Sequence, residues 1–67
     1  MDIDELKRLI FNRGFNIVSF SDAVGIDRST LYRRLADSGS TFTIEEIKRI
    51  KEVLNINDEK ATQIFLS

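Results

Sequence analysis

The most informative segment of the chain reads Phe20-Ser-Asp-Ala-Val-Gly25-Ile-Asp-Arg-Ser-Thr-Leu31-Tyr-Arg-Arg-Leu35. Its apolar side chains on either side of Gly25 recur at helical spacing. They can all point inward only if two helices cross steeply about Gly25, and Ser21 is small where one helix would press on the other. The segment therefore predicts two short helices joined by a tight turn, Ile17 to Val24 and Arg28 to Asp37.

The second of these helices has an outward face made of polar side chains. Packing its leucines inward leaves four side chains outside by helical phase: Arg28, Ser29, Tyr32 and Arg33. These are hydrogen-bonding groups of the kind that read base edges. Residues 27–34 hold three Arg and one Asp, a local charge of +2, whereas the whole chain carries −1. We therefore expect the basic charge to gather on this helix.

Capping signals mark the starts of these helices and of the first helix. Asp2 with Glu5 three residues later forms a capping-box pattern for a helix over 1–13, and Gly14 follows where a left-handed residue is commonly needed. Asn16 is a good N-cap, as is Asp27. Phe15 and Phe20 have the spacing of a hydrophobic staple around Asn16.

Two more helices follow a polar loop over 38–41. Thr43 with Glu46 is the clearest capping box of the chain, and it opens a helix that runs to about Leu54. Asn57 then caps a last short helix. The chain is thus expected to be all-α, a compact bundle of five helices that forms one domain over 1–67, with no internal repeat and no linker.

Composition excludes several classes of function. The 67 residues include no Cys and no His, so there is no disulfide framework, no thiolate nucleophile and no ready metal-ligand set. Acidic pairs such as Asp58/Glu59 lie in first turns of helices, where capping explains them. We therefore expect no enzyme and no cofactor. Apolar runs are too short to cross a bilayer, which favours a cytoplasmic protein.

Residues 20–35 resemble the helix-turn-helix of the Xre or lambda-repressor-like family. Gly25-Ile-Asp-Arg-Ser-Thr-Leu31 is close to that family's usual run of glycine, apolar, polar, polar, Ser, Thr, apolar. Together with Phe42-Thr-Ile-Glu-Glu-Ile47, the whole chain is similar to short phage or prophage regulators. It departs from the pattern at Ser21, usually Ala, and at Arg34, often an apolar or aromatic residue.

The resemblance implies a sequence-specific regulator of Cro or repressor type, in which the helix 28–37 lies in the major groove of an operator duplex. The residues that the resemblance assigns to DNA contact are Arg28, Ser29, Thr30, Tyr32 and Arg33 on that helix. It also places Asn16 and Ser19 against the DNA backbone. Amides at a helix N-terminus suit phosphate independently of the resemblance.

Other interpretations remain open at this point. The low pI of about 5.3 and the apolar C-terminus favour an antirepressor-like module that docks on another regulator protein. A helical scaffold without a DNA role would not need Gly25 in that position. Phe11 lies off the first helix's apolar stripe, and we expect it to pack on the C-terminal residues as part of the core. An exposed Phe11 would instead mark an interface. Ile64, Phe65 and Leu66 suggest a homodimer through the last helix.

Overall fold

The computed structural model describes residues 1–36 and 42–66, and every regular element in these ranges is an α-helix. The five helices are α1 Ile3–Asn12, α2 Ile17–Val24, α3 Arg28–Ala36, α4 Ile44–Leu54 and α5 Asp58–Phe65. The all-α prediction is confirmed. The expected end of the third helix at Asp37 and the expected loop over 38–41 lie outside the described residues.

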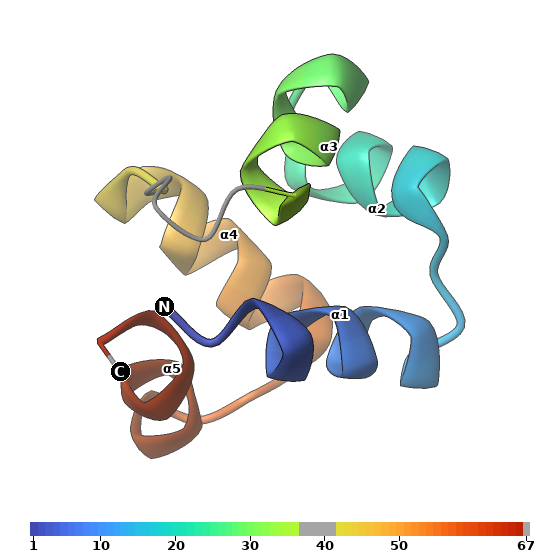
Figure 1. The fold of residues 1–67 in the computed structure, drawn as a ribbon. Helices are drawn as coiled ribbons and strands as arrows, with labels where there is room; N and C mark the ends of the chain where they lie inside the picture. The colour runs from blue at the N-terminus through green and yellow to red at the C-terminus, as the bar shows by residue number, and fades with distance from the viewer. Residues whose placement is uncertain (37–41, 67) are drawn as a thin grey trace.

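The helices enclose one core to which each of them contributes. In Figure 1, α2 and α3 lie together at one end of the molecule and α5 at the other, with α1 and α4 between them. α2 packs against α3 and α4, and α1 packs against α5. The largest fully buried side chains are Phe20, Leu6, Ile10, Leu31, Ile50, Leu54 and Ile64. The Cα radius of gyration is 10.6 Å, close to the roughly 11 Å of a compact chain of this length.

Three of the helix junctions are built in the same way. Each places a residue of positive φ after the helix, then a buried or half-buried apolar residue, then the N-cap of the next helix. The three junctions are Gly14-Phe15-Asn16, Gly25-Ile26-Asp27 and Asn55-Ile56-Asn57. In each, the apolar residue's N–H donates to the carbonyl five residues earlier, at 3.1 to 3.2 Å. This closure satisfies the last carbonyls of a helix while it turns the chain.

The start of α1 differs from its predicted capping box. The Asp2 carboxylate accepts the Glu5 amide at 3.1 Å, as expected. The Asp2 N–H, however, donates to the Ile64 carbonyl at 2.7 Å. The Glu5 carboxylate instead pairs with Arg8 and, at 3.1 Å, with Lys60 of α5. The bonds to Ile64 and Lys60 tie the start of α1 to α5, and the bonds from Arg8 and Lys60 lower the pKa of Glu5.

The other predicted caps are confirmed. Thr43 and Glu46 form a complete capping box, and the Asn57 side chain accepts the Lys60 amide at 2.8 Å. Phe15 and Phe20 meet edge to face, with 5.6 Å between ring centroids, as the staple predicts. Arg13 adds a long-range hydrogen bond that the sequence does not indicate. Its Nε donates to the Leu54 carbonyl at 3.0 Å, which satisfies a carbonyl at the end of α4.

Two expectations about apolar residues are wrong: that Phe11 packs on the C-terminal residues, and that Ile64 and Phe65 are free to form an interface. Phe11 does not pack on the C-terminal residues as core, because 55% of it is exposed. Conversely, Ile64 is fully buried and Phe65 is half-buried against Phe42, with 6.0 Å between their ring centroids. Because the last helix uses these two side chains to close the core, Leu66 alone of the predicted interface residues is exposed, at 79%. None of the described helices is both long and apolar enough to span a bilayer.

Candidate nucleic-acid interface

The turn at Gly25 fixes which side of α3 faces solvent. Gly25 has a left-handed φ of 70°, which ends α2 and lets the chain turn into α3. Leu31 and Leu35 are buried, and the fully buried Val24 lies at the end of α2. The pattern of Phe20 to Leu35 therefore predicted the inward face of both helices correctly.

The residues expected on the outer face of α3 are exposed. Arg28, Ser29, Tyr32 and Arg33 all lie at the surface, and Thr30 is half-buried at the edge of this face. Tyr32 has 66% of its surface free, so it does not pack beneath a neighbouring helix. Four of the five side chains predicted on α3 thus share one solvent-facing side.

The first turn of α3 is capped by Asp27. Its Oδ2 accepts the Ser29 amide at 3.0 Å and the Thr30 amide at 3.3 Å. The two amides are therefore unavailable to a phosphate, and what Ser29 and Thr30 can offer a ligand is their hydroxyl groups. A hydroxyl donates and accepts, so it can bond to either type of base-edge group.

The arginines of α3 have unequal surroundings. Arg28 lies 3.9 Å from Asp22, and both side chains are largely exposed, so their attraction is weak. Arg33 is exposed and forms no ion pair with any described residue. Arg34 turns the other way and pairs with Glu46 at the start of α4.

This arrangement corrects the charge expected on the outer face. The local sum of +2 counted Arg34, whose charge is compensated away from that face by Glu46. Two arginines and Asp27 remain, a net of +1, with Asp22 beside Arg28. Arg33 is consequently the cation of α3 best placed to meet an incoming anion.

The start of α2 uses its polar side chains on its own backbone. The Asn16 side chain accepts the Ser19 amide at 2.8 Å, and Ser19 Oγ accepts the Asn16 amide at 3.0 Å. The sequence predicted the cap but not this reciprocal bond. The amides of Ile17 and Val18 donate to no acceptor in the described chain, and they are the groups that this helix start can offer to a phosphate.

An apolar groove of about 260 Å³ runs beside α3. It is lined by Lys7, Phe11, Ile17, Tyr32, Leu35 and Ala36, so it brings the end of α1 and the start of α2 to the side of α3. The exposed Phe11, which the sequence did not place, belongs to this groove.

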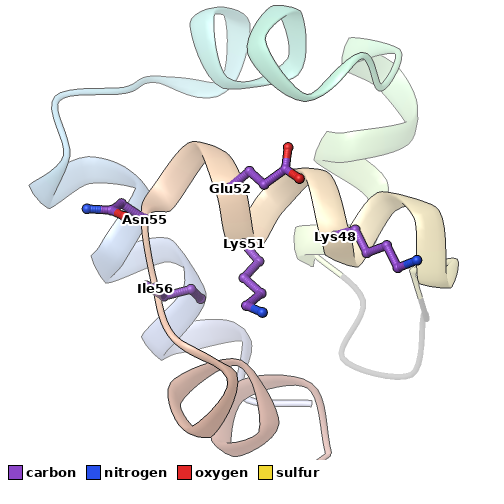
Figure 2. Close-up of a pocket in the computed structure, with 5 residues that line it drawn as sticks. All are labelled: Lys48, Lys51, Glu52, Asn55 and Ile56. Carbon is purple, nitrogen blue, oxygen red and sulfur yellow. The ribbon is translucent and has the colours of Figure 1, made fainter.

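A second hollow, of about 440 Å³, lies on α4 and carries no comparable chemistry. Figure 2 shows its lining residues, Lys48, Lys51, Glu52, Asn55 and Ile56, pointing in different directions. Glu52 points to the side of α2, whereas Lys51 points toward α5, where it pairs with Asp58. Among residues 1–36 and 42–66, no group of acidic side chains is arranged to hold a metal ion.

Comparison with known proteins gives no assignment: no protein-family model, no curated protein and no solved structure matches this chain.

Proposed function

We propose that the chain is a DNA-binding transcriptional regulator of the Xre or lambda-repressor-like family, of the short phage or prophage type, with α2 and α3 as its helix-turn-helix. The observation that carries the proposal is the orientation of α3. Leu31 and Leu35 hold it to the core, and this leaves Arg28, Tyr32 and Arg33 together on its free side.

The dimensions of α3 suit the major groove. An α-helix with its side chains is roughly 10 to 12 Å across, and the groove is about 12 Å wide. An arginine can bond to both O6 and N7 of a guanine, a serine hydroxyl can bond to several base edges, and the Tyr32 ring can pack on a thymine methyl. The free amides at the start of α2 would lie against the phosphate backbone beside that groove.

A regulator built in this way acts by occupying its operator in the cytoplasm of a bacterial host. It excludes polymerase or a competing repressor from the same duplex, and this mechanism requires no cofactor. The net charge of −1 leaves little general attraction to DNA, so affinity depends on the local contacts of α2 and α3.

A second copy of the chain is the proposed partner in operator binding. A mainly apolar groove of about 390 Å³ lies between α4 and α5, and its lining includes Ile47, Phe65 and Leu66. Ile44, 75% exposed, lies one turn before Ile47 on α4 and extends the same side. A symmetric pair joined here would present two copies of α3 to two half-sites.

Selection from a random duplex pool, followed by sequencing, tests the proposal. We expect an enriched motif with two-fold symmetry and half-sites about one helical turn apart.

Replacing Arg28 and Arg33 together with Ala should lower affinity for the enriched duplex by at least tenfold, since one bidentate guanine contact contributes about 1 to 3 kcal/mol. Arg8→Ala, which removes an exposed cation on α1 that lines neither groove, is the matched control. Retained binding by the double variant would reject α3 as the reading helix.

An antirepressor-like module that docks on another regulator is the alternative, and the exposed groove around Phe11 and Tyr32 favours it. The burial of Ile64 and Phe65 removes part of the earlier support, which came from the C-terminus. Phe11→Ser separates the two functions, because it should leave duplex binding unchanged while it weakens the binding of a protein to this groove.

A further inference from the structure

Arg34 differs from the other arginines of α3 in what surrounds it. Its side chain is only 22% exposed and pairs with Glu46, whose side chain is 14% exposed. Its guanidinium carbon lies 5.4 Å from the centroid of the Phe42 ring, within the range of a cation–π contact. Both partners lie at the start of α4, so Arg34 attaches the last turn of α3 to that point.

The partners of Arg34 are themselves held in place. Glu46 Oε1, which receives Arg34, also accepts the Thr43 amide at 2.8 Å, and Thr43 Oγ1 accepts the Glu46 amide at 3.1 Å. The carboxylate therefore cannot turn away from Arg34 without opening the cap of α4. Phe42 is buried and held in turn by its edge contact with Phe65.

Besides the buried Leu31 and Leu35, two anchors at opposite ends consequently restrict the rotation of α3 about its own axis. The Gly25 turn and the Asp27 cap fix the first turn, and Arg34 fixes the last. Arg33 is the neighbour of Arg34 in the chain, yet it faces solvent. Groups that recognise a ligand by hydrogen bonds need to be held within about 0.5 Å and 10 to 20° of their working geometry.

We propose that Arg34 is a positioning residue for base reading: it touches no DNA, and it sets the rotation at which Tyr32 and Arg33 meet the bases. This inference rests on the proposed function. It has a measurable signature, because a charge compensated by Glu46 releases no counterions when DNA binds, whereas an exposed arginine that meets a phosphate does.

The salt dependence of binding tests the inference with Arg34→Met and its neighbour Arg33→Met. The probes are the duplex enriched by the wild-type chain and an unrelated duplex of equal length. Arg33→Met removes an exposed charge that no described residue compensates, so it should lower the slope of log affinity against log salt, by at most about 0.9. Arg34→Met should keep the slope and the affinity for the unrelated duplex, but lose about tenfold of the preference for the enriched duplex, the size of one lost base contact.

Amide hydrogen exchange provides a second readout that does not need DNA. Arg34→Met should speed exchange in the last turn of α3 and leave α1 and α5 unchanged. Glu46→Gln should do the same, because it keeps an oxygen for the Thr43 amide but removes the charge that holds Arg34. Arg33→Met should have no such effect. Circular dichroism checks that each variant is folded.

The outcomes separate the two proposals. A lower salt slope in Arg34→Met would make Arg34 a phosphate contact, and unchanged preference or unchanged exchange would remove its positioning role. If the wild-type chain prefers no duplex, the proposed function fails, and the exchange measurement still decides whether Arg34 fixes α3.

Discussion

Gly25 is needed for its backbone conformation and not for lack of space. Its φ is 70°, and a Cβ built there would meet no heavy atom within 4 Å. The left-handed region costs an L-residue roughly 1 to 2 kcal/mol, and Asn tolerates it better than Ala. Asn55 has φ of 53° at the equivalent position of the last junction, so the chain already uses both residue types there.

The first prediction follows from this difference. Gly25→Ala should lower the free energy of unfolding by roughly 1 to 2 kcal/mol, and Gly25→Asn should lower it by less than half as much. Urea denaturation of the two variants measures both values. Equal losses would mean that a neighbouring group, and not φ, excludes the side chain.

The acid stability of the protein depends in part on Glu46. Burial raises the pKa of this carboxyl group, but the bonds from Thr43 and Arg34 outweigh it and leave the pKa below its ordinary value of 4.5. A depressed pKa contributes stability that is fully present above 4.5 and is lost as pH falls through the folded value.

We therefore predict that Glu46→Gln destabilises the protein near neutral pH and that the difference from the wild-type chain shrinks as the pH falls below 4.5. Denaturation curves at a series of pH values from neutral into acid measure the difference. Glu5→Gln is a useful comparison, because the pKa of Glu5 is also lowered, but by the exposed Arg8 of α1 and the half-buried Lys60 of α5. A difference that persists in acid would show that charge on Glu46 contributes nothing.

Individual helices are the level at which the sequence was most informative. Caps, staples and apolar stripes are local patterns, so Asn16, Thr43 and Asn57 marked helix starts without knowledge of the fold. Contacts between residues distant in the chain could not be predicted from these local patterns. Nothing near Glu5 indicates that Lys60 joins it, and nothing near Arg13 indicates that it caps α4.

The same distinction applies to the candidate site. Helical phase placed Arg28, Tyr32 and Arg33 outside, because phase is a property of one helix. It could not show that Arg34 turns to Glu46, because that contact depends on how α3 crosses α4. The positive φ of Asn55 could have been noticed, since the segment Asn55-Ile56-Asn57 repeats the order of residue types around Gly25.

The start of α2 gives a prediction for one helix. Asn16→Asp should keep the cap, because Asp and Asn are equally good N-caps, but it places a negative charge where a phosphate is expected. Affinity for the enriched duplex should fall about fivefold, the effect of like charges roughly 4 Å apart in water.

Asn57→Asp is the matched control, since the Asn57 side chain accepts an amide three residues later as Asn16 does, and α5, which it caps, lies at the other end of the molecule from α2 (Figure 1). Fluorescence anisotropy with a labelled duplex measures both variants. Equal affinities would show that the start of α2 does not approach the DNA backbone.

At the scale of the whole molecule, four of the five large exposed apolar side chains of the described residues lie on two sides, Val18 being the exception. Phe11 and Tyr32 lie beside α3, and Ile44 and Leu66 lie along α4 and α5. Small proteins seldom leave large apolar patches free, so each side is a candidate for contact with another chain. The proposed dimer uses the second side, which leaves α3 open to DNA.

Leu66→Lys should therefore convert the dimer to a monomer without unfolding it, because Leu66 is exposed and contributes little to the core. Sedimentation equilibrium over a range of protein concentrations measures the change, and Phe11→Ser serves as a control on the other side. A wild-type chain that stays monomeric at high micromolar concentration would contradict the proposed dimer.

Two of the three matching junctions enclose α2, so this helix can be considered as an exchangeable unit. Each junction brings its own stop signal, its own apolar plug and its own start signal, so a helix of another length could be grafted between two of them without redesigning its ends. α3 and α4 are also joined by side chains, since Arg34 contacts both Glu46 and Phe42. A foreign helix transplanted in place of α3 should therefore carry an arginine at position 34 to be seated at the same angle.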